Sequence, residues 1–101
     1  MPEFRRVAPC EDVPEGEGRS FEFEDRRIAL FRINGEFHAI DDVCVHRGGP
    51  LADGPVRGSV VTCPWHGWAF DVTTGRHTRD PEIGVPTYRC RITDGNIEVE
   101  I

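Results

Sequence analysis

Lysine is absent from this sequence of 101 residues, so all 12 basic side chains are arginine. Eighteen acidic residues outnumber them and leave a formal net charge of -6 at pH 7. An acidic surface repels the phosphate backbones of DNA and RNA, which argues against a nucleic-acid partner. A partner protein with a basic patch suits this charge better.

Long apolar runs are missing as well. No segment approaches the roughly 20 consecutive apolar residues that cross a bilayer, so we predict no membrane association. The first ten residues carry Glu3, Arg5 and Arg6 where a signal peptide has a continuous apolar stretch. We therefore expect a cytoplasmic protein. With 38% hydrophobic and 30% charged residues, the composition is that of a globular protein, and the length predicts a single domain over residues 1–101.

No segment has the period of an amphipathic helix, whereas turn-forming residues recur at short intervals. Asn34-Gly35 within residues 28–41 and Asp94-Gly95 within residues 88–101 predict two-residue hairpin loops of type I′. Further strands are expected at 4–8, 20–23, 59–62 and 68–71. The sequence therefore predicts an all-β fold, either an antiparallel β-sandwich or a partly open barrel.

Folding about Asp94-Gly95 places apolar and charged partners on opposite faces of that hairpin. One face would pair Ile92 with Ile97, Cys90 with Val99 and Tyr88 with Ile101, and the other Arg91 with Glu98 and Arg89 with Glu100. The alternation within 28–41 is less clean, which predicts burial on both faces of that hairpin. The segment 9–19 is rich in acidic residues, glycine and proline, and is expected to be a surface loop.

The four cysteines are Cys10, Cys44, Cys63 and Cys90. In the cytosol thiols stay reduced, and clustered cysteines more often bind metal than form disulfides. Two of the four have a histidine close by, in Cys44-Val45-His46 and in Cys63-Pro64-Trp65-His66. Both segments lie in loops rich in glycine and proline, where several ligands can converge on one point. We predict a metal site whose ligands are Cys44, His46, Cys63 and His66.

Two cysteines and two histidines also suit a tetrahedral zinc site. Zinc modules usually pair like with like, as C-x2-4-C and H-x3-5-H, whereas each segment here mixes one cysteine with one histidine. In a Rieske centre two imidazoles replace two thiolates on one iron of a [2Fe–2S] cluster. A structural zinc module remains the alternative from a different class.

The two segments resemble the cluster-binding boxes of Rieske proteins, here called the first box, Cys44 to Gly48, and the second box, Cys63 to Trp68. The 16 residues between His46 and Cys63 match that family's spacing, and residues 70–75 resemble the strand and turn that follow the second box in Rieske ferredoxins. The resemblance covers about residues 25–101. It implies a Rieske-type β-sandwich, with two loops forming a small cluster-binding subdomain. It also implies one [2Fe–2S] cluster, with Cys44 and Cys63 on the inner iron and His46 and His66 on an outer, more exposed iron.

The chain departs from the Rieske proteins of respiratory complexes at four positions. Those proteins have an extra disulfide where this chain has Gly49 and Trp65, and hydroxyl donors to sulfur where it has Trp68 and Phe70. Hydrogen bonds to sulfur stabilise the reduced cluster, so their loss predicts a potential near the bottom of the Rieske range, at about -150 mV.

The resemblance implies a soluble one-electron carrier and not an enzyme, so no catalytic residue is predicted. Its expected partners are a flavin-containing NAD(P)H reductase and a terminal ring-hydroxylating oxygenase. The alternative is the small subunit of an NADH-dependent nitrite reductase, which would bind that enzyme's large subunit.

Several other residues receive plainer interpretations. Cys10 and Cys90 are expected to be buried, inert thiols, and His38 and His77 to be structural or surface histidines. Trp65 and Trp68 either shield the cluster or anchor a partner. The acidic residues of the segment 9–19 are expected to be solvated.

Overall fold

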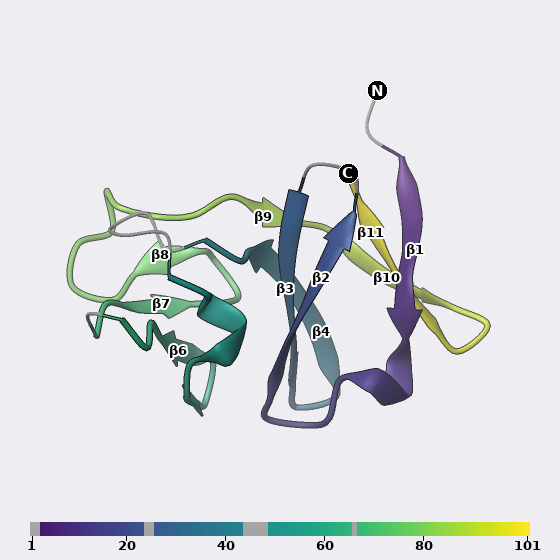
Figure 1. Cartoon of the computed structure of the whole chain (residues 1–101), viewed down its shortest axis with the longest axis horizontal. Helices are drawn as coiled ribbons and strands as arrows, with labels where there is room; N and C mark the ends of the chain where they lie inside the picture. Colours follow the sequence, from purple (N-terminus) through teal and green to yellow (C-terminus); the bar gives the residue numbers. More distant parts are fainter. Residues whose placement is uncertain (1–2, 24–25, 44–48, 66) are drawn as a thin grey trace.

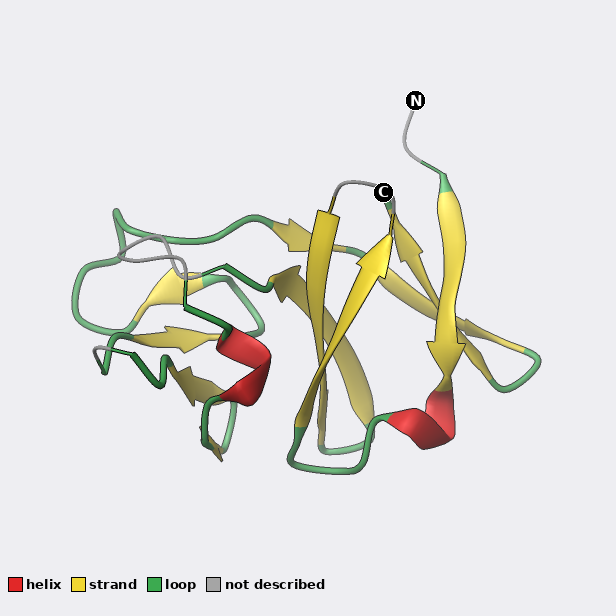
Figure 2. Cartoon of the chain, viewed as in Figure 1, coloured by secondary structure: helices red, strands yellow, loops and turns green. Residues whose placement is uncertain are grey.

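The computed structural model describes residues 3–23, 26–43, 49–65 and 67–101 (Figure 1). In these ranges the chain forms antiparallel sheets, and its helical segments are two short 3-10 helices, η1 (Cys10–Asp12) and η2 (Leu51–Asp53) (Figure 2). The all-β prediction is therefore confirmed. Within the same ranges, none of the helical segments has the length and apolar character that would let it span a membrane.

Three sheets make up the described part of the fold. The first sheet has the order β1 (Phe4–Pro9), β11 (Asn96–Glu100), β10 (Cys90–Thr93). The middle sheet has the order β2 (Gly18–Phe23), β3 (Arg26–Ile33), β4 (Glu36–Asp41), β9 (Thr87–Tyr88). The third sheet has the order β5 (Val56–Arg57), β6 (Val60–Thr62), β7 (Ala69–Asp71), β8 (Arg76–His77). Figure 1 shows the middle sheet between the other two.

Strand β3 is buried on both faces because it serves two hydrophobic cores. Ile28 and Leu30 point into one core with Ile97 and Val99 of the first sheet. The alternate residues of β3 point into the other core with η2 and the third sheet; they are Ala29, Phe31 and Ile33. Alternating side chains of one strand face opposite ways, so a strand between two layers reads as an almost continuous apolar run. The prediction of burial on both faces is confirmed.

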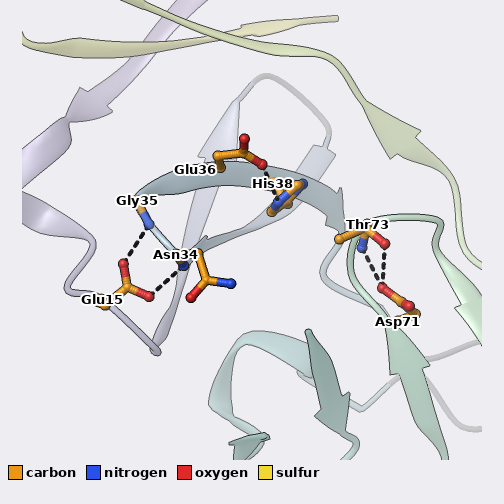
Figure 3. A network of polar contacts seen from close by, with 7 residues as sticks. All are labelled: Glu15, Asn34, Gly35, Glu36, His38, Asp71 and Thr73. Carbon is orange, nitrogen blue, oxygen red and sulfur yellow. Dashed lines mark hydrogen bonds and ion pairs between the residues drawn. The ribbon is translucent and has the colours of Figure 1, made fainter. Parts of the chain in front are cut away.

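Both predicted hairpin turns are present. Asn34 and Gly35 have φ values of 53° and 80°, and Asp94 and Gly95 have 51° and 77°. Positive φ at both central residues is what a type I′ turn requires. The first of these turns is capped by Glu15, whose two carboxylate oxygens each accept a backbone hydrogen bond of 2.7 Å, from Asn34 and Gly35 (Figure 3).

The structure corrects three expectations drawn from local patterns. Ile92 pairs with Ile97 as predicted, but its side chain is 56% exposed because β10 is an edge strand. Tyr88 does not pair with Ile101; it belongs to β9 and pairs with Ala39 of the middle sheet. The segment 9–19 is not wholly a surface loop, since it contains η1 and the fully buried Val13.

The turn after β7 is fixed by Asp71. Its Oδ1 accepts hydrogen bonds from the backbone N–H and the hydroxyl of Thr73, at 2.9 and 2.6 Å (Figure 3). Partial burial alone would raise the pKa of Asp71, but hydrogen bonds from Thr73 and Ser59 and the nearby His38 outweigh it and lower this pKa. These hydrogen bonds fix the start of the turn that leads from β7 to β8.

Candidate metal centre

The second box is the loop of the hairpin formed by β6 and β7. Thr62 and Ala69 are paired across this hairpin, and the loop closes on itself. The Cys63 N–H donates to the Trp68 carbonyl at 2.7 Å, and the Gly67 N–H donates to the Cys63 carbonyl at 3.1 Å. Gly67 has a φ of 76°, a conformation that glycine adopts without strain. The predicted ligand Cys63 is therefore the first residue of a tight, hydrogen-bonded loop.

Burial changes sharply along this loop. Cys63 is 2% exposed and packs in the core that contains Phe70. Pro64 and Gly67 are exposed, and Trp65 is 56% exposed. The loop thus holds its cysteine inside the protein and presents its other end to solvent.

The first box follows β4 and precedes η2. Its predicted ligands Cys44 and His46 lie outside the described residues, as does His66 of the second box. Gly49, directly after the first box, is buried. A Cβ atom at Gly49 would lie 2.7 Å from the Cys63 Sγ and 3.0 Å from the Trp65 Cγ. Because real Cβ atoms essentially never come so close to other atoms, this position accepts only glycine without a rearrangement.

The position of Gly49 has two consequences for the candidate metal centre. Gly49 lies against Cys63 and Trp65 of the second box, although it directly follows the first box in the chain. It also leaves the Cys63 thiol beside bare backbone, which suits the close approach of an inorganic group. Gly49 and Trp65, which replace the extra disulfide of respiratory Rieske proteins, indeed lie next to each other. The residues present fit a cluster held between the two boxes.

Asp42, two residues before the predicted ligand Cys44, is a buried charged residue that our sequence analysis missed. Its side chain is fully buried, and it is the one buried polar or charged side chain among the described residues. Its carboxylate accepts hydrogen bonds from the Ser20 hydroxyl, the Arg27 guanidinium and the Ala52 N–H. The available signal was an acidic residue directly after an apolar strand and two positions before Cys44. The sequence alone does not distinguish a buried aspartate at this position from an exposed one at the end of an ordinary strand.

His77 was predicted to be a structural or surface histidine, and in the structure it packs beside the second box. Its ring meets the rings of Trp68 and Phe70 edge-on, with centroids 5.0 and 5.5 Å apart. Its Nδ1 accepts the backbone N–H groups of Arg79 and Asp80 at 3.0 and 3.2 Å. His77 thus ties the following loop to the second box, and a surface hollow of about 500 Å³ lies between them.

Cys10 and Cys90 are free thiols packed beside the core that joins the first and middle sheets. Burial raises the pKa of the Cys90 thiol from 9.0 to about 12, so Cys90 stays protonated at neutral pH. Its S–H points to the Tyr88 carbonyl at 3.9 Å. The prediction of buried thiols is met only in part, because Cys10 and Cys90 are both partly buried.

Comparison with known families decides which class of site this is. The model of the Rieske [2Fe–2S] domain family matches residues 3–89. The chain belongs to the Rieske [2Fe–2S] domain family. The predicted fold and the predicted [2Fe–2S] cofactor are thereby confirmed, and a structural zinc module is not supported.

Relatives of this Rieske domain cover nearly its whole length. The ferredoxin component of the naphthalene 1,2-dioxygenase system of Pseudomonas aeruginosa is 31% identical over 91 residues, which are 89% of this chain and 88% of that protein. A chain in the solved complex of reduced oxygenase and oxidised ferredoxin of carbazole 1,9a-dioxygenase superposes with a TM-score of 0.87 at 26% identity, covering 96% of this chain and 92% of that one. A Mycobacterium tuberculosis protein described as an NADH-dependent nitrite reductase small subunit superposes with a TM-score of 0.89 at 27% identity, covering 100% and 96%.

Proposed function

We propose that this Rieske domain is a one-electron carrier whose [2Fe–2S] cluster is held by Cys44, His46, Cys63 and His66. When bound, such a cluster accepts and releases a single electron. The observation that supports this ligand set is the approach of Gly49 to the Cys63 sulfur, because it places the residue directly after the first box beside the proposed ligand of the second box. The proposed donor is a flavin-containing NAD(P)H reductase, and the proposed acceptor is a terminal ring-hydroxylating oxygenase.

The described residues provide what a carrier of this kind needs. Core residues around Cys63 exclude water from the inner side of the site. Trp65, Pro64 and Gly67 keep the other side at the surface, where a partner can come close. The relatives named as ferredoxin components of dioxygenase systems support the oxygenase as the acceptor. We also propose a single domain over residues 1–101 and a cytoplasmic location.

The ligand set is tested by low-temperature EPR of the anaerobically purified, dithionite-reduced protein. We expect a signal whose average g value lies below that of all-cysteine clusters, because two imidazoles donate less charge to iron than two thiolates. A signal typical of four cysteine ligands would overturn the assignment of His46 and His66. A redox titration of the same sample should give a midpoint near the bottom of the Rieske range, at about -150 mV.

The proposed partners are tested by reconstitution. Reductase, oxygenase and NAD(P)H are mixed with and without this protein, and product formation is followed. We expect turnover only when the protein is present. Turnover that does not depend on it, with the cognate reductase and oxygenase, would contradict the carrier role and leave the cluster assignment intact.

The likeness to a nitrite reductase small subunit favours a second candidate function, that of a permanent subunit. The two functions differ in how strongly the protein is held by its partner. A diffusing carrier should elute alone in size-exclusion chromatography of a cell extract, whereas a subunit should co-elute with a much larger nitrite-reducing protein. Co-elution together with nitrite reduction would replace the oxygenase assignment.

A further inference from the structure

The buried carboxylate of Asp42 connects the three elements β2, β3 and η2. Its Oδ2 accepts the Ser20 hydroxyl of β2 at 2.6 Å and the Arg27 guanidinium of β3 at 3.2 Å. Its Oδ1 accepts the Ala52 N–H of η2 at 2.7 Å. Its own N–H donates to the Arg27 carbonyl at 3.0 Å. A carboxylate buried to this extent is costly unless its oxygens are satisfied, and here both are.

Asp42 therefore fixes both ends of the segment that contains the first box. The segment starts directly after Asp42 itself and ends at η2, which the Ala52 bond ties back to the same side chain. Consecutive Cα atoms are 3.8 Å apart, so two peptide units keep the Cα of Cys44 within about 7.6 Å of the Cα of Asp42. The covalent chain thus limits the distance between the Cα of Asp42 and the Cα of the proposed ligand Cys44.

The Asp42 carboxylate forms an ion pair with the Arg27 guanidinium at 3.2 Å. The Arg27 guanidinium and the Ala52 N–H are donors only, and an ionised carboxylate is an acceptor only. Arg27 supplies one compensating positive charge, but its side chain is 44% exposed and is therefore partly screened by water. Asp42 is 0% exposed, so its own charge is screened much less.

We propose that Asp42 lowers the midpoint potential of the cluster, through the negative charge of a buried carboxylate that belongs to the residue two positions before the proposed ligand Cys44. Reduction adds one negative charge to the cluster, and a nearby fixed negative charge disfavours that step. This inference rests on the proposed ligands Cys44 and His46 and does not depend on which partners exchange electrons with the protein.

The test is a redox titration of the purified, cluster-loaded protein and of three variants. Asp42→Asn removes the charge but keeps an oxygen for the Ala52 N–H. Asp53→Asn is the matched control, because Asp53 adjoins Ala52 in the chain but is exposed. Arg27→Gln removes the compensating positive charge. The spectrum of the wild-type protein establishes beforehand that the cluster is bound, so a failure of the proposed function would be recognised separately.

We expect Asp42→Asn to shift the midpoint to a more positive value than Asp53→Asn does, and the shift to persist in 1 M salt. A midpoint for Asp42→Asn equal to that of Asp53→Asn, or more negative, would overturn the proposal. If Asp42→Asn does not retain the cluster, Arg27→Gln decides the matter. A midpoint more negative than that of the wild-type protein supports the proposal, and an unchanged or more positive midpoint overturns it.

Discussion

The same residue type has different chemistry at different places in this chain, because its neighbours differ. Cys63 starts a hairpin loop and faces a glycine that leaves room beside its sulfur. Cys90 lies against an apolar core, where burial raises its pKa to about 12. Thiolates bind metals and react as nucleophiles, whereas a protonated, desolvated thiol is inert. Cys63 is itself only 2% exposed, so the feature that distinguishes the proposed ligand is the glycine beside its sulfur at the start of a hairpin loop.

Replacement of His66 tests the proposed ligands one residue at a time. A His66→Cys variant that binds the cluster should have a lower midpoint potential and a higher average g value than the wild-type protein, because thiolate donates more charge to iron. His77→Gln is the control, since His77 lies beside the second box but is not a proposed ligand. An unchanged EPR spectrum in His66→Cys would show that His66 is not a ligand.

The raised pKa of Cys90 predicts how the free energy of unfolding changes at alkaline pH. The thiol has a reference pKa of 9.0, and burial raises the folded-state pKa of Cys90 to about 12. Between these values the unfolded chain loses the proton and the folded chain keeps it, so the free energy of unfolding falls as pH rises. The fall is at most about 1.4 kcal/mol for each pH unit. We expect it in urea titrations of the wild-type protein above pH 9.

The comparison with Cys90→Ala isolates this contribution. Burial and the Asp41 hydrogen bond also raise the pKa of Tyr88, which lowers alkaline stability in both proteins. The difference in unfolding free energy between wild type and Cys90→Ala should therefore become smaller above pH 9. A difference that stays constant from pH 8 to pH 11 would contradict a buried, protonated Cys90.

At the scale of elements, short hairpins and their turns position the site. The second box is the loop of the hairpin formed by β6 and β7. Ala29 and Phe31 of β3 belong to the same hydrophobic core as Cys63 of this box. The turn between β3 and β4 depends on a distant segment, since Glu15 caps both of its backbone N–H groups. Glu15, which lies in the connection between η1 and β2, therefore helps to hold the β3–β4 turn of the middle sheet.

Removal of the Glu15 cap tests this connection. Glu15→Ala leaves the N–H groups of Asn34 and Gly35 to water, and we expect it to lower the free energy of unfolding by about 1 kcal/mol. Glu17→Ala is the matched control, because Glu17 makes only an exposed ion pair with Arg19 at 3.2 Å. Such surface pairs contribute about 0–1 kcal/mol. Equal urea midpoints for the two variants would show that the cap does not stabilise the turn.

At the scale of the whole molecule, charge is unevenly distributed along the chain. Residues 44–86 contain four arginines and four acidic residues, whereas the remainder contains eight arginines and fourteen acidic residues. The segment with both boxes is formally neutral, and the net charge of -6 belongs to the rest of the chain.

Two exposed hydrophobic residues distinguish the faces of the molecule. Trp65 and Ile92 are each 56% exposed, but Trp65 belongs to the second box and Ile92 to β10 of the first sheet. Trp65→Ala should raise the concentration of carrier required for half-maximal oxygenase turnover by roughly thirtyfold, since a buried tryptophan anchor contributes about 2 kcal/mol to an interface. Ile92→Ala should leave this concentration unchanged. Equal effects of both substitutions would exclude the second box as the docking surface.

The sequence alone determined those features that depend on neighbours in the chain. Cys44-Val45-His46 and Cys63-Pro64-Trp65-His66 predicted the type of cofactor, because each segment contains its own pair of donors. Asn34-Gly35 and Asp94-Gly95 predicted two hairpins, because a two-residue loop fixes its own register.

Only the tertiary structure decided the features that depend on distant segments. The burial of Asp42 requires β2, β3 and η2 to meet, and the contact of Gly49 with Cys63 requires the two boxes to meet. Tyr88 pairs with Ala39 of β4 and not with Ile101 of the predicted hairpin. Ile92 is exposed on β10, which is the edge strand of its sheet. Local spacing shows which residues can act together, whereas burial and long-range packing determine which of them do.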